Sequence, residues 1–198
     1  MKKTVSYLVS FLIIASGILL YSACSCQGEM ITSYFNNDDE GWTVVGDAQK
    51  GSSTPDYTEE GGHPGGYISA DDNVAGGVWY WNAPEKFLDD RSSSYGKKIS
   101  FSLKQSSTNN QFDASDIILF GDGEKIVFDL PDNPDLTWTS YMVELDENAG
   151  WRYNNLNGDT VSKDDFYKIM TDLTAIHIRG EYVTGTDTGG LDTVILYI

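Results

Sequence analysis

A short mixture of aromatic, cationic and amide side chains is the clearest group in the sequence that could bind a ligand. Trp151, Arg152, Tyr153 and Asn155 lie close together in the chain. Sugar rings stack their apolar C–H faces on exposed aromatic rings, and nearby polar groups hydrogen-bond the hydroxyls. We therefore expect these residues to form a carbohydrate-binding surface. The alternative is that their rings belong to the core.

A second aromatic run, Trp79-Tyr80-Trp81, is better explained by packing than by binding. In a strand, Trp79 and Trp81 lie on one face and Tyr80 lies on the other, because successive side chains alternate. We expect the run to pack inside the fold.

The sequence shows no group of residues typical of a common catalytic mechanism. The two histidines are isolated: His63 lies in a glycine-rich loop, and His177 alternates with isoleucines that would face the core. Two such residues make no zinc site without acids brought from elsewhere. No serine has the context of a nucleophile elbow, so acyl transfer lacks support. Paired acids for glycoside hydrolysis remain an alternative, because their separation is spatial.

The overall charge argues against two classes of partner. The 198 residues include 30 Asp and Glu against 13 Lys and Arg, a formal net charge of −17. Nucleic-acid binding needs a basic stripe that releases counterions from phosphates. Anionic lipid surfaces likewise attract basic segments. We therefore expect no nucleic-acid partner and no direct adsorption to a membrane.

The first residues are typical of an export signal. Two lysines precede an apolar run over residues 7–21, which is short for a bilayer span and suits a signal peptide. The next residues, 21–24, resemble a bacterial lipoprotein cleavage box. This predicts a signal peptide over residues 1–23 and lipid attachment at Cys24. Ordinary secretion, with cleavage after Ala23 or at Ser25, is the alternative.

The cysteines agree with an exported, lipid-anchored protein. Cys24 and Cys26 are the only two, so no disulfide, thiolate metal site or thiol nucleophile can form downstream. The expected location is the bacterial outer membrane or the cell surface as a lipoprotein, or otherwise the medium. The membrane would be contacted only through the anchor at Cys24.

The rest of the chain predicts a short tether over residues 24–33 and one domain over 34–198. In the best strand signal, Ile99, Phe101 and Leu103 alternate with polar residues. A glycine-rich turn at residues 121–123 indicates a hairpin. The predicted strands are 98–105, 116–120, 124–130, 140–145, 175–182 and 193–198.

One short helix should follow Ser162, which forms an approximate capping box with Asp165. Its apolar face would consist of Phe166, Ile169, Met170 and Leu173. Such a helix should lie across an edge or an end of the sheets. Many short strands and one helix predict an all-β, antiparallel jelly-roll sandwich.

Two long stretches resemble the laminin B (laminin IV) family. The first spans residues 66–88 and continues through 94–101, with an aromatic and Ala-Pro-x-x-Phe-Leu pattern and then Ser-Tyr-Gly before an alternating strand. The second, 158–182, has a helix and then a strand with an Ile-Arg-x-x-Tyr pattern. At Asp89 the family more often has Gly, so this turn requires a residue that tolerates left-handed φ.

The resemblance implies a galactose-binding-like jelly roll that serves as a structural and interaction module without catalysis. Many relatives with this sandwich bind carbohydrate, and many hold a structural calcium ion. In related sandwiches the first and last strands pair and acids at both ends share the ion, which here implies Asp38, Glu40 and Asp192. Such oxygens suit calcium, which takes about six to eight of them. The alternative is that Asp38 serves a turn and Asp192 a solvated strand end.

These features together predict a non-enzymatic binding or adhesion module at the cell surface. Its expected partner is a glycan or an extracellular protein, and its expected cofactor is the structural calcium. A polysaccharide-acting enzyme and a purely structural subunit of a surface assembly are the alternatives.

Overall fold

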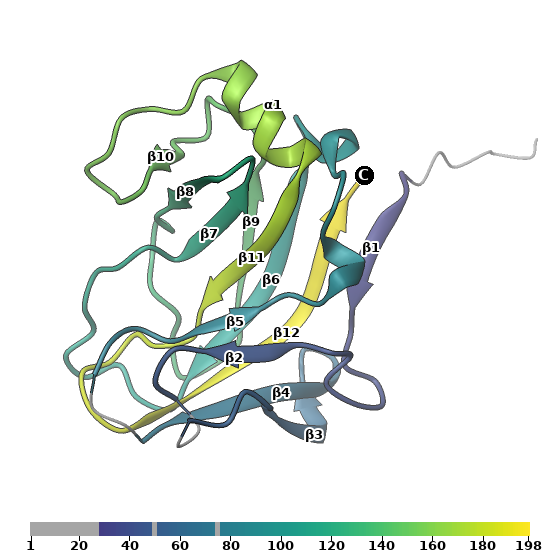
Figure 1. Ribbon diagram of the computed structural model, residues 1–198. Helices are drawn as coiled ribbons and strands as arrows, with labels where there is room; N and C mark the ends of the chain where they lie inside the picture. Colours follow the sequence, from purple (N-terminus) through teal and green to yellow (C-terminus); the bar gives the residue numbers. More distant parts are fainter. Residues whose placement is uncertain (1–27, 49–50, 74–75) are drawn as a thin grey trace, which may run out of the picture.

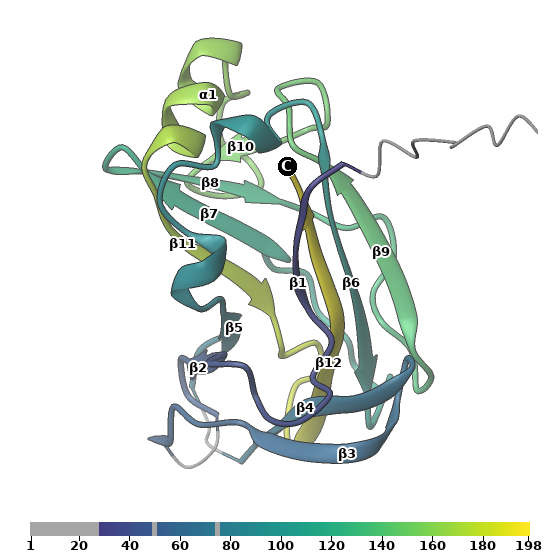
Figure 2. The same cartoon turned by 90° about the vertical axis from the view of Figure 1, so that its right-hand side faces the viewer.

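The computed structural model describes residues 28–48, 51–73 and 76–198. The predicted signal peptide and Cys24 lie outside these residues. Within them, the strands form two antiparallel sheets of six that stack face to face (Figures 1 and 2). The predicted all-β jelly-roll sandwich is confirmed. The described residues contain no helix long and apolar enough to cross a membrane.

The first sheet is built around the longest strand, β12. Its members are β1 (Met30–Ser33), β3 (Asp56–Gly62), β4 (Gly65–Asp72), β6 (Lys98–Gln105), β9 (Thr139–Glu144) and β12 (Asp187–Tyr197). The first half of β12 pairs with β4. The second half pairs with β1, with Met30 opposite Tyr197. The two ends of the domain therefore lie side by side. Residues 30–33 of the predicted tether belong to this sheet, so that boundary was wrong.

The second sheet lies in front of the first in Figure 1. Its strands are, in spatial order, β10 (Arg152–Tyr153), β8 (Glu124–Phe128), β7 (Ile117–Gly121), β11 (Leu173–Arg179), β5 (Tyr80–Asn82) and β2 (Thr43–Val45). The predicted β7–β8 hairpin is confirmed. Asp122 and Gly123 have φ of 52° and 74°, the left-handed values that a two-residue hairpin turn requires.

The helix α1 (Lys163–Thr171) caps one end of the sandwich (Figure 1). Ser162 is its N-cap and accepts a hydrogen bond from the Asp165 N–H at 3.2 Å, as predicted. Its apolar side chains are buried, together with Leu173 just beyond its end. Two 3-10 turns, η2 (Glu85–Phe87) and η3 (Ser92–Ser94), connect β5 to β6. Between them Asp89 has φ of 71°, the left-handed conformation expected there.

The core between the sheets is rich in aromatic side chains. Trp79 and Trp81 are fully buried and meet edge to face at 4.9 Å, so the prediction of packing is confirmed for these two residues, whereas Tyr80 between them is partly exposed. Phe101 and its alternating neighbours on β6 are buried as well. Ser102, one of the polar residues that alternate with them, is also only 3% exposed, because the Ser140 hydroxyl at 3.0 Å and the His63 ring at 3.3 Å lie against it.

A buried ion pair joins the end of β11 to the segment before β7. The Arg179 guanidinium contacts the Asp116 carboxylate at 3.3 Å, and both side chains are 1% exposed. The guanidinium also donates to the carbonyl oxygens of Phe112 and Glu181. The Phe112 and Tyr182 rings lie 4.5 and 4.3 Å from it. Burial raises the pKa of Asp116 to about 6, so the carboxylate is ionised, and the pair fully charged, only well above this pH.

Replacing Arg179 with Met leaves the Asp116 carboxylate buried without its cation. Losing one partner of a buried pair costs about 3–5 kcal/mol, so the free energy of unfolding in urea should fall by that amount. The matched control is Lys98→Met, which removes the cation of an exposed pair with Glu144 at 3.2 Å and should cost less than about 1 kcal/mol. Equal losses in the two variants would contradict the stabilising role of the Arg179–Asp116 pair.

Candidate functional site

One row of side chains crosses the whole outward face of the second sheet. Directly opposed positions on neighbouring antiparallel strands point to the same face. Ile176 and Ile178, on either side of His177, are buried in the core, so His177 and its cross-strand partners point outward. This cross-sheet row comprises Thr43, Asn82, His177, Ile118, Val127 and Arg152, of which Ile118 and Val127 are nevertheless buried. His177, which was expected to face water if its isoleucine neighbours face the core, points to the outward side but is only partly exposed.

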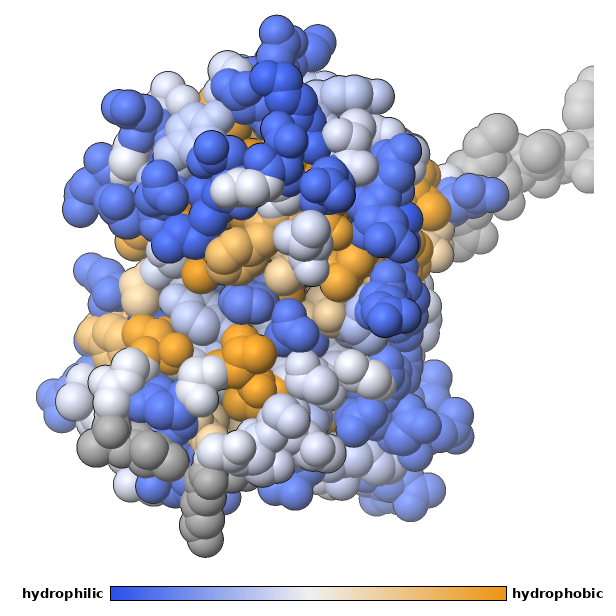
Figure 3. All heavy atoms as spheres, viewed as in Figure 1, coloured by the Kyte–Doolittle hydropathy of each residue, from blue (hydrophilic) through white to orange (hydrophobic). Residues whose placement is uncertain are grey.

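Three partly exposed rings lie next to one another on this face. His177 on β11 lies 5.8 Å from the Tyr80 ring on β5 and 4.9 Å from the Phe120 ring on β7. We call Tyr80, His177 and Phe120 the ring face. Figure 3 shows apolar residues gathered across the middle of this side of the molecule, over β7, β11 and β5, with polar residues above and below. The rings therefore form an aromatic strip on an apolar floor.

The imidazole in the middle of the ring face is uncharged at neutral pH. Burial lowers the pKa of His177 below its ordinary value of 6.5. A neutral imidazole carries one N–H donor and one acceptor nitrogen. His177 can therefore hydrogen-bond a hydroxyl group in either direction while its ring remains part of the aromatic strip.

Polar groups adjoin the ring face at the end of the row formed by β5 and β2. An open hollow of about 510 Å³ there is lined by side chains that include Thr43, Asn82, Glu40 and Lys86. The Asn82 amide donates to the Thr43 hydroxyl at 3.1 Å, and Lys86 forms an ion pair with Glu40. Stacking surfaces beside fixed donors and acceptors are the combination that sugar-binding sites use.

The prediction that Trp151 binds sugar is wrong. Its side chain is fully buried, packs on Phe128 at 5.2 Å and Phe166 at 5.7 Å, and donates from Nε1 to the Glu144 carbonyl at 3.0 Å. Strand alternation explains the error. Trp151 immediately precedes β10 and points inward, whereas Arg152 points outward.

The other three predicted binding residues lie in different surroundings. Arg152 stands at the β10 end of the cross-sheet row and is partly exposed. Tyr153 packs against the core, and burial and a hydrogen bond with Asp165 raise the pKa of its hydroxyl to about 12. Asn155 is exposed in the turn after β10, where its Oδ1 accepts from the Asn157 N–H at 3.0 Å. Of the predicted group, Arg152 is therefore the member placed on the outward face.

The three predicted calcium ligands already accept hydrogen bonds from N–H groups. Glu40 accepts from the backbone of Tyr34 and Phe35 at 3.0 and 2.7 Å, in addition to its ion pair. Asp38 accepts from the Glu40 N–H at 2.8 Å. Asp192 is fully buried, so it is no solvated strand end, and accepts from the His63 and Thr193 N–H groups.

The hydrogen bonds at these three carboxylates would oppose the binding of a calcium ion. Across residues 28–48, 51–73 and 76–198, no group of three or more His, Cys, Asp or Glu side chains is placed to hold a metal ion. Calcium would have to compete with the N–H donors of each carboxylate, and with Lys86 at Glu40. Calcium binding through Asp38, Glu40 and Asp192 stays a prediction.

Sequence reasoning missed two members of the ring face. It assigned Tyr80 to packing together with its tryptophan neighbours, and it did not single out Phe120. The available signal was alternation: Leu119 beside Phe120 and Trp81 beside Tyr80 are buried, so both rings had to point outward. That they meet at His177 depends on strand register, which alternation does not give.

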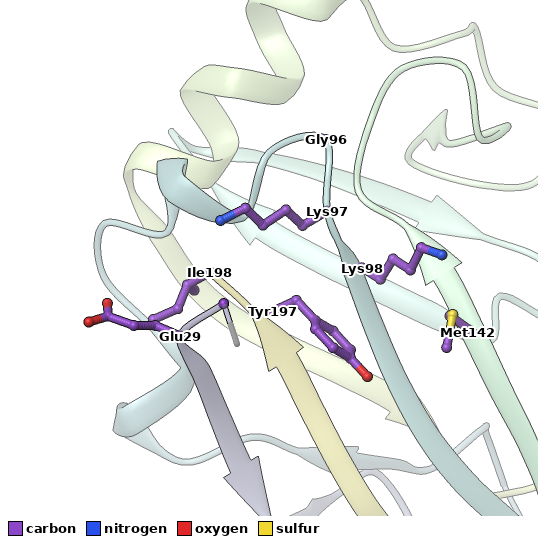
Figure 4. A pocket seen from close by; sticks show the side chains of 8 residues that line it. Glu29, Gly96, Lys97, Lys98, Met142, Tyr197 and Ile198 are labelled. Atoms are coloured by element: carbon purple, nitrogen blue, oxygen red, sulfur yellow. The ribbon is translucent and has the colours of Figure 1, made fainter. Parts of the chain in front are cut away.

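Two other hollows are weaker candidates. One, of about 430 Å³, lies where β1 begins and β12 ends, and Figure 4 shows Lys97 and Lys98 there pointing away from each other. The other, of about 230 Å³, lies on the outward face of the first sheet beside Tyr67. There the Lys104 ammonium lies 4.0 Å from the Tyr67 ring and 4.6 Å from the Trp138 ring, so these rings already have a partner.

Comparison with known proteins finds a matching family model and similar laminin subunits. A family model described as Laminin B (Domain IV) matches residues 80–198. The chain is 29% identical over 170 residues to laminin subunit gamma-1 of Danio rerio, covering 84% of the chain and 10% of that protein. It is 31% identical over 164 residues to laminin subunit gamma-2 of Homo sapiens, covering 78% and 13%. The chain thus spans about a tenth of these relatives.

Solved structures share the fold. The L4b domain of human laminin alpha-2 superposes with a TM-score of 0.62 at 19% identity, over 79% of this chain and 90% of that domain. The module CtCBM11 superposes with a TM-score of 0.52 at 19% identity, over 88% of this chain and 97% of that one. At these identities the likeness is one of architecture.

If calcium binds at Asp38, Glu40 and Asp192, millimolar calcium should raise the melting temperature and a chelator should reverse the rise, because a ligand of the folded state stabilises it by mass action. Glu40→Gln keeps the size of the side chain and should abolish the rise. Asp159→Asn, at an exposed acid of the turn after β10, is the control. A melting temperature that calcium and chelator leave unchanged would contradict the calcium prediction.

Proposed function

The chain belongs to the laminin B (domain IV) family, and we propose on this basis that it is an exported, non-enzymatic binding module that holds a neutral polysaccharide on the ring face. The observation that carries the proposal is the strip of Tyr80, His177 and Phe120, three neighbouring partly exposed rings supplied by three adjacent strands. A sheet is a rigid support, so the rings need little reorganisation to bind.

The polar groups around the strip suit hydroxyls. Asn82 and Thr43 lie at one end of the cross-sheet row and Arg152 at the other, and the neutral His177 imidazole lies between them. Amide, hydroxyl, imidazole and guanidinium groups all hydrogen-bond sugar hydroxyls. A chain of sugars laid across the strands would therefore meet apolar rings in the middle and polar groups at both ends.

The charge of the protein favours an uncharged glycan. A formal net charge of −17 produces a field that repels polyanions at long range. Arg152 and Lys125, which lies opposite Phe120, are cationic groups beside the ring face, but they do not offset that excess. This argument selects neutral polysaccharides as the ligand class over acidic ones.

Titration calorimetry against soluble neutral polysaccharides tests the proposal. Tyr80→Ala and Phe120→Ala should each weaken binding about fivefold, because stacking on one aromatic ring contributes on the order of 1 kcal/mol. Tyr67→Ala removes a partly exposed ring of the other sheet and is the matched control. If Tyr67→Ala loses binding while the first two variants keep it, the glycan binds the first sheet and not the ring face. If no polysaccharide binds at all, the proposal is refuted.

The proposal includes lipid anchoring at Cys24, for which the support is the apolar run and the cleavage box in the sequence. Expression in a bacterium with labelled fatty acid should label the wild-type protein and leave Cys24→Ser unlabelled and released from the membrane fraction. Cys26→Ser is the matched control and should keep the label. Label on the Cys24→Ser variant, or none on the wild type, would contradict the anchor.

A further inference from the structure

Four acidic side chains gather at the end of the sandwich opposite α1. Asp72 ends β4 and Asp187 begins β12, and the register places them directly opposite each other. Glu181 lies in the connection from β11 to β12, and Asp47 follows β2. Asp72 and Asp187 are each 4% exposed and Glu181 is 8% exposed. Like charges directly across a strand pair destabilise a sheet, so this cluster costs the fold free energy.

One of these carboxylates is both deeply buried and unsatisfied. Neither Asp187 oxygen has a hydrogen-bond partner among the described residues. Both oxygens of Asp47 also lack a partner there, and its carboxylate abuts the backbone of Gly76. Burying a polar group without a partner costs free energy, and an unpaired charge costs more. Buried polar groups are usually paired with a protein group or with ordered water, so an unpaired carboxylate needs a physical explanation.

The mutual repulsion of these carboxylates favours the binding of a positive charge. Burial first, and then the charges of Asp72, Glu181 and Asp71, raise the pKa of Asp187 to about 7. Burial, Asp72 and Asp47 raise the pKa of Glu181 to about 7, against opposing effects of the Trp79 N–H and Arg179. The nearby cation Arg179 is already paired with Asp116. Near neutral pH Glu181 and Asp187 are therefore partly protonated, and a bound cation would displace these protons.

A pocket opens onto two members of the cluster, Asp72 and Glu181, while Asp187 and Asp47 lie behind them and do not line it. It has a volume of about 390 Å³ and is lined by Asp72 and Glu181, by the apolar side chains Val78 and Phe112, and by Thr184 and three glycines. The acids supply charge at the wall, and the apolar side chains supply surface for a hydrocarbon stem. Long cationic side chains bury their methylene stems in this way while the charged head meets its partners.

We call this pocket, with Asp72 and Glu181 in its wall, the acid pocket. From this geometry we infer that the acid pocket receives an arginine or lysine side chain of a protein partner. An arginine suits it best, because the planar guanidinium spreads several N–H donors over a fork that can reach separated carboxylates. A point-like metal ion suits it less, since in the described part of the chain no three such side chains are placed to share one ion. The pocket is separate from the ring face, so the two proposals stand or fall independently.

The test uses the blocked tripeptide Gly-Arg-Gly as probe, with Gly-citrulline-Gly as its uncharged, nearly isosteric control. Binding is followed by NMR titration of the protein. We expect saturable binding of the arginine peptide with shifts at Val78, Phe112 and Thr184, and none with the citrulline peptide. Affinity should rise between about pH 6 and about pH 8, because Glu181 and Asp187 lose their protons over this range.

Two variants of the acidic cluster and one control variant locate the site. Asp187→Asn should weaken peptide binding at least fivefold at about pH 8 and, by relieving repulsion, raise the melting temperature of the free protein. Asp164→Asn removes the same charge from an exposed position on α1 and should change neither. Glu181→Gln is the second pocket variant, for use if Asp187→Asn fails to fold.

Three outcomes would overturn the inference. Equal binding of the citrulline peptide would show that charge is not recognised. Equal weakening in Asp164→Asn would show only a net-charge effect. If calcium chloride at the same ionic strength raises the melting temperature and Asp187→Asn removes that rise, while the arginine peptide has no effect, the cluster is a metal site instead.

Discussion

The buried pair of Arg179 and Asp116 is the interaction on which the rest of the structure depends. It ties the end of β11 to the segment before β7, and it holds the carbonyl groups of Phe112 and Glu181 through the same guanidinium. A guanidinium buried between two rings and a carboxylate allows little rearrangement, because every alternative leaves a charge unpaired in the interior. The segments that it fixes form one border of the ring face and one wall of the acid pocket.

The alternation of the strands divides the aromatic residues between two tasks. Trp81 and Leu119 face inward and contribute to the core, while their neighbours Tyr80 and Phe120 face outward and meet His177. The same residue type therefore stabilises the sandwich on one side and offers a binding surface on the other. The carboxylates of the acid pocket differ from these aromatic residues, because burying them destabilises the fold. A bound cation would restore that stability.

Local patterns predicted most of the architecture. Ile99, Phe101 and Leu103 gave the central strand β6, Ser162 and Asp165 gave the start of α1, and the turn at Asp122 and Gly123 gave the β7–β8 hairpin. Each of these signals lies within a few residues of the structure that it predicts. The candidate site was predicted less well. Arg152 lies on the outward face, but Trp151 is in the core, and the acid pocket was not anticipated at all.

The sequence by itself determined the fold class, the positions of about half of the strands and of the helix, and the buried side of strands such as β6 and β11, because these follow from hydrophobic period and turn chemistry. Only the tertiary structure decided which outward residues become neighbours. Tyr80, Phe120 and His177 come from distant parts of the chain, as do Asp72 and Asp187, and strand order and register bring them together. A shift of register by one residue would send each side chain to the opposite face, and no local pattern specifies that register.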